Sequence, residues 1–154
     1  MLRTDRIERS INMSHHTVQE IVIPGELPTL NAVLAATKSH WSMYAATKKQ
    51  MTNKVAYLAR KDLRPIENSV EVEIEWTTKD RRQDPDNISY GAKYLLDGLV
   101  AAGILQDDNR KIVCSIAHRF PEPSKKHPQV RMVLTEVPKC GMNGQPNGKK
   151  TKPS

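Results

Sequence analysis

The chain has 154 residues, with 24 Lys or Arg against 17 Asp or Glu, so its formal net charge is +7 at pH 7. This length is typical of one domain with tails, and the positive charge favours a polyanionic partner, nucleic acid first. No apolar run approaches the length of a membrane span, so we expect no membrane partner. Cys114 and Cys140 belong to no CxxC or zinc-type spacing, which predicts reduced cysteines in a cytoplasmic protein.

The N-terminal part of the chain predicts an extension, a strand and a loop. Residues 1–16 are polar and charged, which predicts a flexible extension. Residues 18–23 form a short apolar run with strand character, and it stops at Pro24 and the glycine that follows. Pro28 predicts that the next stretch is irregular.

Residues 41–64 have the apolar periodicity of a helix, and Pro65 follows its expected end. Seven Lys or Arg and one Asp lie between Lys38 and Arg64. This charge has two interpretations, a solvated helix face or a surface that follows a phosphate backbone.

The clearest strand in the sequence runs from Val70 to Trp76. Four apolar residues alternate with three glutamates there, so one face of the strand is buried and the other is polar. We interpret the glutamates as a solvated sheet face and not as metal ligands. The strand leads to a basic run, Lys79, Arg81 and Arg82, that ends at the first of several aspartates.

Residues 84–108 read DPDNISYGAKYLLDGLVAAGILQDD and predict a helix with an aspartate pair at either end. The apolar stripe of this helix consists of Ile88, Ala92, Leu95, Leu96 and Leu99. At about 100° per residue, the opposite side carries Asp86, Tyr90, Lys93 and Asp97. Gly103 stands where a helix stop is expected, and Asp107 and Asp108 follow just before a β-like run.

The two aspartate pairs are candidate metal ligands. Aspartates packed together repel one another unless a cation lies among them, and oxygen ligands favour Mg²⁺ or Mn²⁺ over zinc. A basic protein with such a site has the parts for metal-assisted cleavage of a phosphodiester backbone. The alternative is an ordinary structural role for each side chain. Asp84 can cap a helix, Lys93 and Asp97 can form a surface ion pair, and Asp107 and Asp108 can belong to a turn.

This block resembles the RusA family of Holliday-junction resolvases, small endodeoxyribonucleases of bacteria and phages. The resemblance covers roughly residues 18–137 and follows a basic run, Asp-x-Asp-Asn, a helix with Lys-x-x-x-Asp-x-Leu, and Asp-Asp before a strand. The matching residues are Arg81, Arg82, Asp84, Asp86, Asn87, Lys93, Asp97, Asp107 and Asp108. Lys93 lies about three positions further from Asp86 than the family pattern implies, which is close to one helical turn.

The resemblance implies a Mg²⁺-dependent endonuclease, with Mn²⁺ as a substitute metal, that cuts DNA four-way junctions as a homodimer. The expected metal ligands are Asp84, Asp86, Asp107 and Asp108, and the expected catalytic set is Asp84, Asp86, Lys93 and Asp108. Lys93 would stabilise charge on the phosphate or position the attacking water. Supporting roles fall to Asn87 and Asp97, and contacts with the DNA backbone to Lys79, Arg81 and Arg82.

Two other functions remain open from the sequence. A non-catalytic nucleic-acid-binding protein would share the basic charge and use its aspartates as caps and turns. A metal-dependent nucleotide hydrolase is disfavoured, because the chain has no Gly-rich loop to cradle phosphates.

The last part of the chain predicts two strands and a tail. Residues 111–119 and 130–137 have strand character and are expected to form a hairpin. Residues 138–154 contain four lysines and no acid, which predicts a disordered basic tail. The element order is βαβαββ, and we expect a single α+β domain over residues 17–137 with a mixed sheet and helices mainly on one face.

Overall fold

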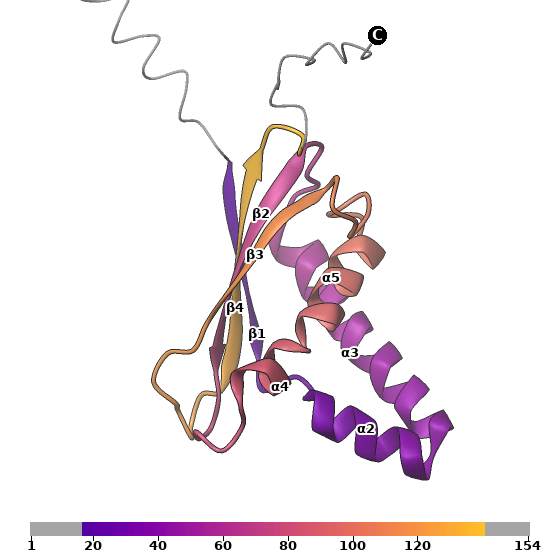
Figure 1. Ribbon diagram of the computed structural model, residues 1–154. Coiled ribbons are helices and arrows are strands. Elements are labelled where there is room, and N and C mark those ends of the chain that lie inside the picture. The colour runs from indigo at the N-terminus through magenta and orange to yellow at the C-terminus, as the bar shows by residue number, and fades with distance from the viewer. Residues whose placement is uncertain (1–16, 141–154) are drawn as a thin grey trace, which may run out of the picture.

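The computed structural model describes residues 17–140, which form a four-stranded sheet and the helices that cover it (Figure 1). The elements in chain order are β1 (Val18–Pro24), α2 (Leu30–Ser39), α3 (Trp41–Asp62), β2 (Ser69–Thr77), α4 (Pro85–Ser89), α5 (Ala92–Ala101), β3 (Val113–Arg119) and β4 (Gln129–Val137). The expected α+β class is confirmed. The extension predicted for residues 1–16, and residues 141–154 of the predicted tail, lie outside the described residues.

The sheet is mixed, with strand order β1-β4-β2-β3. β4 runs antiparallel to both β1 and β2, whereas β3 runs parallel to β2. The predicted hairpin of the last two strands is wrong, because β2 lies between them. After β2 the chain returns through α4 and α5 to the starting end of that strand, so β3 pairs with β2 in the parallel direction. The other edge of β2 is taken by β4, in a register that runs from Ser69–Val137 to Thr77–Gln129.

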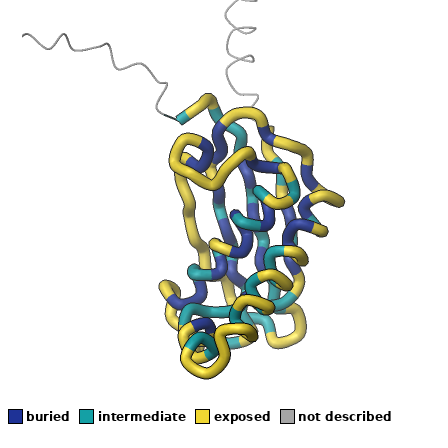
Figure 2. Tube along the Cα trace, turned by 90° about the vertical axis from the view of Figure 1, so that its right-hand side faces the viewer, coloured by how far each residue is buried: buried dark blue, intermediate teal, exposed yellow. Residues whose placement is uncertain are grey.

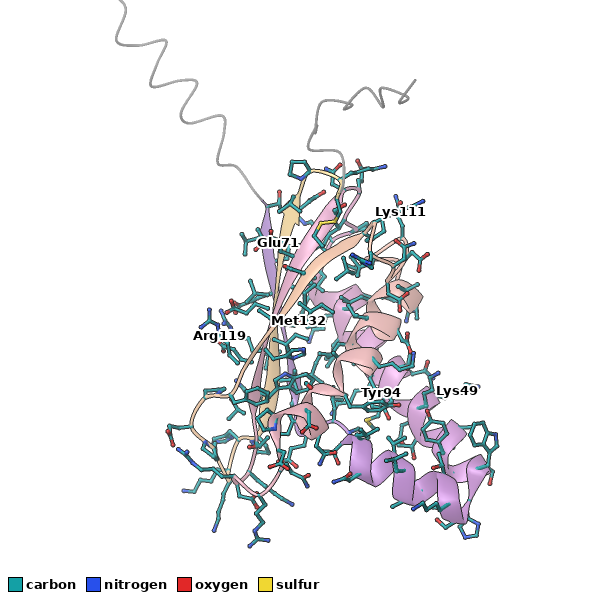
Figure 3. The ribbon with its side chains drawn as sticks, in the orientation of Figure 1. Lys49, Glu71, Tyr94, Lys111, Arg119 and Met132 are labelled. Carbon is teal, nitrogen blue, oxygen red and sulfur yellow. A yellow bond between two sulfur atoms is a disulfide. The ribbon has the colours of Figure 1, made fainter. Side chains whose placement is uncertain are left out.

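The helices of the described chain lie on one face of the sheet, as expected (Figure 1). The alternation in β2 explains this arrangement, since its apolar residues all face the helices and none is more than 3% exposed. From the helical side, Val55 and Ala59 of α3 and Leu95 and Leu99 of α5 are completely buried. Met132, also completely buried, lies at the middle of the sheet (Figure 3).

The glutamates of β2 lie on the opposite, uncovered face of the sheet, as predicted. Arg131 bridges Glu20 and Glu75, with nitrogen–oxygen distances of 2.6 and 3.3 Å. Arg119 pairs with Glu73 at 3.0 Å. The uncovered face is therefore a network of ion pairs in which carboxylates outnumber guanidinium groups, and it does not attract a polyanion.

The expected single helix after Asp84 is in fact two helices, α4 and α5, joined by a turn at Tyr90 and Gly91. Backbone bonds of the i to i+3 type replace the regular helical pattern there, including Gly91 N–H to the Ile88 carbonyl. The indole of Trp76 packs against this turn so closely that a Cβ on Gly91 would lie 2.9 Å from the ring. The bend follows because β2 brings a large side chain under the helix. Gly103 follows the last residues of α5 with a φ of 75°, so it stands at the helix stop as predicted.

α2 occupies the stretch that Pro28 had predicted to be irregular, so that prediction is wrong. The hydroxyl of Thr29 caps the helix by accepting a hydrogen bond from Ala32 N–H at 3.4 Å. α3, in contrast, matches the predicted helix within two residues of its end. None of the helices between residues 17 and 140 is both long enough and apolar enough to cross a membrane.

Cys114 and Cys140 form a disulfide, with their Cα atoms 5.7 Å apart. The predicted reduced thiols are therefore wrong in this structure, while the cytoplasmic location stays a prediction. Cys114 lies where the pairing of β3 with β2 shifts by one residue. The backbone N–H of Cys140 donates to the buried hydroxyl of Ser69 at 2.8 Å, and that hydroxyl donates to the Lys111 carbonyl at 2.7 Å. The fold brings the two cysteines together from positions 26 residues apart, a pairing that spacing alone does not reveal.

Candidate functional site

The first aspartate pair lies where the chain leaves β2 and enters α4. Asp84 is the capping residue of α4, and its carbonyl accepts hydrogen bonds from Asn87 N–H and Ile88 N–H, both at 3.1 Å. Its carboxylate, however, makes no capping bond. The carboxylate of Asp86 accepts one bond, from Asn87 N–H at 2.9 Å. Both side chains are exposed, and neither forms an ion pair with any residue between 17 and 140.

Asn87 fixes this corner of the molecule. It is 7% exposed, and its side-chain oxygen accepts a hydrogen bond from the Asn31 backbone N–H at 2.8 Å. Its amide nitrogen donates to the side chain of Gln83. Asn87 therefore ties the start of α2 to α4 and supports the segment that carries the two preceding aspartates, and both ends of its amide are used in these contacts. The sequence did not point to these contacts of Asn31 and Gln83, since the first is made by a backbone N–H and both depend on how the chain folds.

The second aspartate pair is built differently. The Asp107 carboxylate accepts hydrogen bonds from the Asp108 N–H and from the Asn109 side chain, both at 2.7 Å. The bond from the Asp108 backbone, with the Asn109 side chain second, holds the pKa of Asp107 below its ordinary value. Asn109 in turn accepts from Lys111 N–H at 2.9 Å. Asp107 thus has the turn role that was its alternative interpretation, and Asp108 beside it is exposed.

The two pairs lie at opposite ends of the sheet (Figure 1). The first pair follows the end of β2, and the second precedes the start of β3, which runs parallel to β2. The 10 residues of α5 separate them, a helix length of about 15 Å. Consistently, Ile66 N–H donates to the Ile104 carbonyl near the start of β2. Among residues 17–140, no group of three or more carboxylate, histidine or cysteine side chains is arranged to hold a metal. One chain therefore does not assemble the expected cluster of four aspartates.

Lys93 and Asp97 form an ion pair of the i to i+4 type at 3.5 Å on α5. Lys93 is half-exposed, with 47% of its side-chain area accessible. This contact matches the surface-pair alternative, and it also leaves Asp97 in the orienting position that was expected for it. The pair follows the Tyr90–Gly91 turn, and Lys93 lies seven positions beyond Asp86 along the chain.

Tyr44, Tyr90 and Tyr94 lie near the N-terminal end of α5. A hydrogen bond with the Tyr44 hydroxyl, followed by burial, raises the pKa of Tyr90. The ring of Tyr94 meets that of Tyr90 edge-on, with centroids 6.1 Å apart. Burial raises the pKa of Tyr94 to about 12, and its hydroxyl has no hydrogen-bond partner within the described part of the chain. Because both pKa values are raised, the phenols of Tyr90 and Tyr94 remain neutral throughout the physiological pH range.

The predicted DNA-contacting residues lie in the loop between β2 and α4. Arg81 is held by both oxygens of Glu122 at 2.6 Å, and this contact raises its pKa. Arg82 pairs loosely with Asp80 at 3.7 Å and is 88% exposed. Lys79 forms no ion pair with a residue of the described range, and its backbone N–H donates to Glu26 at 2.7 Å. Lys79 and Arg82 are thus the available cations, whereas Arg81 is largely neutralised.

The same loop closes a pocket of about 180 Å³ that the sequence analysis did not find. Its lining includes Glu26, Thr29, Trp76, Lys79, Arg82 and Gln83. The pocket joins the β1–α2 loop to the β2–α4 loop, so it depends on contacts between segments far apart in the chain.

Comparison with known proteins identifies no relative. The chain matches no model of a known protein family, and a search of curated proteins finds no related sequence. The resemblance to the RusA family therefore rests on the aspartate block and on the order of the elements around it.

Proposed function

We propose that this protein is a Mg²⁺-dependent endonuclease that resolves DNA four-way junctions in the manner of the RusA family, with Mn²⁺ as a substitute metal. The observation that carries the proposal is the first aspartate pair. Asp84 and Asp86 present exposed carboxylates without a cationic partner among the described residues, on a corner fixed by buried Asn87. Unneutralised acids held this rigidly in a chain of net charge +7 are suited to a cation from solution.

The donor set fits Mg²⁺. This ion keeps several waters and is commonly bound through one or two carboxylates together with substrate phosphates, so two aspartates suffice to begin a site. When bound, the metal would polarise the phosphate and activate a water molecule. Arg82 and Lys79 would orient the DNA backbone, because Lys79 forms no ion pair within the described residues and Arg82 is 88% exposed and pairs only loosely with Asp80. Lys93 would act only if DNA binding drew it away from Asp97, 3.5 Å away.

The proposed DNA-binding side is the helical one. The uncovered face of the sheet carries an excess of carboxylates, whereas α3 and its flanks carry seven Lys or Arg and one Asp between Lys38 and Arg64. Phosphates are attracted to the second of these surfaces. This distribution favours the phosphate-following interpretation of the basic helix.

The separation of the two aspartate pairs bears on the proposed homodimer. A two-fold dimer presents two copies of each pair and suits a substrate that must be cut on two opposed strands. Within such a dimer, Asp108 of one chain can approach Asp86 of the other, which it does not do within one chain. We therefore propose that Asp108 acts in trans if it acts at all.

A mixing experiment tests this arrangement. Asp86→Asn and Asp108→Asn homodimers should each be inactive, while the mixed dimer should regain nicking of one strand, because one of its two sites contains both aspartates. If the ligands acted within one chain, the mixed dimer would stay inactive. If Asp108→Asn cuts like the wild type, Asp108 is not a ligand, and the site rests on Asp84 and Asp86 alone.

The direct test of the activity uses a synthetic four-way junction with Mg²⁺, with Mn²⁺ and with EDTA, and linear duplex of the same sequence as the control. We expect paired cuts in the junction with either metal and none with EDTA. Tight junction binding without cleavage under all conditions would contradict the nuclease and leave the second function, a non-catalytic nucleic-acid-binding protein. The turn role of Asp107 and the Lys93–Asp97 pair are the observations that favour this second function.

The resemblance also implies a cytoplasmic protein encoded by a bacterium or a phage, which we retain as part of the proposal. Sedimentation at micromolar concentration, with and without junction DNA, tests the homodimer independently of catalysis.

A further inference from the structure

A groove between α3 and α5 combines exposed aromatic rings with lysines. It has a volume of about 500 Å³, and its lining includes Trp41, Tyr44, Lys48, Lys49, Thr52 and Asp97. Trp41, Tyr44, Lys48 and Thr52 follow one another at three or four positions, so they form one stripe along α3, and Lys49 lies next to it. The groove contains none of the four aspartates proposed as metal ligands.

Trp41 is the most unusual residue of this groove. Its side chain is 70% exposed although it stands at the first position of α3, next to the bend between α2 and α3. Its ring contacts that of Tyr44, with centroids 5.4 Å apart and planes tilted by 47°. Tyr44 is partly buried and packs against the hydrophobic core. The exposed ring of Trp41 therefore lies on a neighbour that the core supports.

The charge around the rings is positive. Lys48 and Lys49 are adjacent and line the groove about one helical turn beyond Tyr44, and neither forms an ion pair within the described range. The one acid of the lining, Asp97, is matched by Lys93 at 3.5 Å. Aromatic faces beside unpaired lysines are the two components of a surface that stacks bases and follows a phosphate backbone.

We propose that this groove binds an unpaired nucleotide of single-stranded or branched DNA, with the base stacked on Trp41 and adjacent phosphates on Lys48 and Lys49. The inference rests on the proposed function for its choice of a nucleic acid partner, and it assigns to the helical face a task distinct from cutting. A four-way junction presents such nucleotides when base pairs open at the point of strand exchange, whereas a continuous duplex keeps its bases paired and stacked inside. The groove would therefore favour branched over linear DNA.

The chain provides its own optical probe. Of its two tryptophans, Trp76 is buried, with 3% exposed, so quenching by an added oligonucleotide reports on Trp41. We expect a single-stranded oligonucleotide to quench the emission and a duplex of the same sequence to quench it much less. Trp41→Ala should weaken binding of the single strand by about tenfold, measured by fluorescence anisotropy of a labelled oligonucleotide in EDTA.

Tyr57→Ala is the matched control. Tyr57 is also an exposed aromatic residue of α3, with 68% of its area accessible, and it lies 16 positions after Trp41. At about 100° per residue it faces about 160° away from Trp41. This variant should bind the oligonucleotide like the wild type. Both variants change solvent-exposed side chains, and equal melting temperatures should verify that both are folded.

A second pair of variants tests the phosphate contacts. Lys48→Ala combined with Lys49→Ala should lower the slope of log affinity against log salt concentration by about 1.4, which corresponds to two single-strand phosphate contacts. Lys61→Ala, on the far side of α3, should leave the slope unchanged.

Three results would overturn the proposal: unchanged affinity in Trp41→Ala, an equal loss in Tyr57→Ala, or a change in dimerisation instead of DNA affinity when Trp41 is replaced. The last result would make the groove an interface between two copies of the chain. Because these assays contain EDTA, they test nucleotide binding in the groove independently of metal-dependent cleavage. Stacking without cleavage retains the groove, and cleavage without stacking retains the metal site.

Discussion

The two corners that carry aspartates have almost the same composition and differ in how their oxygens are used. At the β2–α4 corner, a buried asparagine supports the backbone, and the carboxylates of Asp84 and Asp86 remain largely free. At the loop before β3, an exposed asparagine donates directly to Asp107 and consumes its oxygen. An asparagine that bonds to the surrounding backbone leaves the neighbouring carboxylates available for a ligand. An asparagine that donates to the carboxylate itself does not.

The largest expected effect separates the two corners by activity. Asp86→Asn should lower junction cleavage by a factor of about 1,000 or more, since stabilisation by a bound metal is worth several kcal/mol. Asp107→Asn should lower it by less than about tenfold, because its carboxylate is already committed to a turn. Single-turnover cleavage at saturating Mg²⁺ measures both. Equal losses in the two variants would mean that Asp107 is a ligand and that the turn rearranges on metal binding.

The second largest effect is a loss of stability that is confined to the corner before β3. Reducing the Cys114–Cys140 disulfide, which links residues 26 positions apart, should lower the free energy of unfolding by about 3.5 kcal/mol. Denaturant titration with and without a dithiol reductant measures this change, and a Cys114→Ser/Cys140→Ser variant should not respond to the reductant. Hydrogen exchange should accelerate at residues 109–114, near the Ser69–Lys111 bond, and stay unchanged in α4. Faster exchange in α4 as well would show that the two corners are not independent.

A smaller difference is expected between the two supporting asparagines. Asn87→Ala should cost about 2 kcal/mol, because it leaves the Asn31 N–H and the Gln83 side chain without their buried partner. Asn109→Ala, on an exposed loop, should cost less than about 1 kcal/mol, since water replaces the lost bonds. Urea denaturation of both variants provides the comparison. A larger loss in Asn109→Ala would reverse our assignment of the rigid corner.

The smallest expected effect is a difference in pH response. Trp76 donates to His118 Nδ1 at 3.0 Å beside the first corner, and burial lowers the pKa of His118 below 6.5. The stabilisation from neutral His118 is complete above pH 6.5 and is lost as the pH falls through the lowered pKa. The pKa of Asp107 is lowered from 3.8, so its contribution persists until the pH falls below 3.8. Trp76 emission should change only in the pH range in which His118 becomes protonated, and His118→Phe should abolish that change. An identical transition in the variant would assign it to another group.

Much of the fold could be predicted because it depends on local patterns. The strict alternation from Val70 to Trp76 places one face of β2 against the helices, and the periodicity of α3 defines that helix almost to its ends. Pairing between strands is not a local property. A hairpin was predicted for the last two strands because they follow one another in the sequence. The actual order depends on the return of the chain through α5, which the residues of β3 and β4 do not encode separately.

The site was predictable in its residue types and not in its geometry. The sequence identifies four aspartates, but the direction of α5 decides that Asp86 and Asp108 lie at opposite ends of the sheet. The bend at Gly91 likewise comes from Trp76, a residue of another element. Long-range packing of this kind also explains the unexpected disulfide, since Cys140 reaches Cys114 only after β4 has joined the sheet.

The strand order has a consequence for the biosynthesis of the protein. β1 is among the first elements made, yet its partner in the sheet is β4, so that Val18 pairs with Thr135. β2 likewise lacks its antiparallel neighbour until residues 129–137 have left the ribosome. Contacts of such sequence separation form slowly, and unpaired strand edges are exposed in the meantime. A nascent chain that ends before β4 should therefore be a target for chaperones, and the sheet is expected to be completed only after β4 has been synthesised.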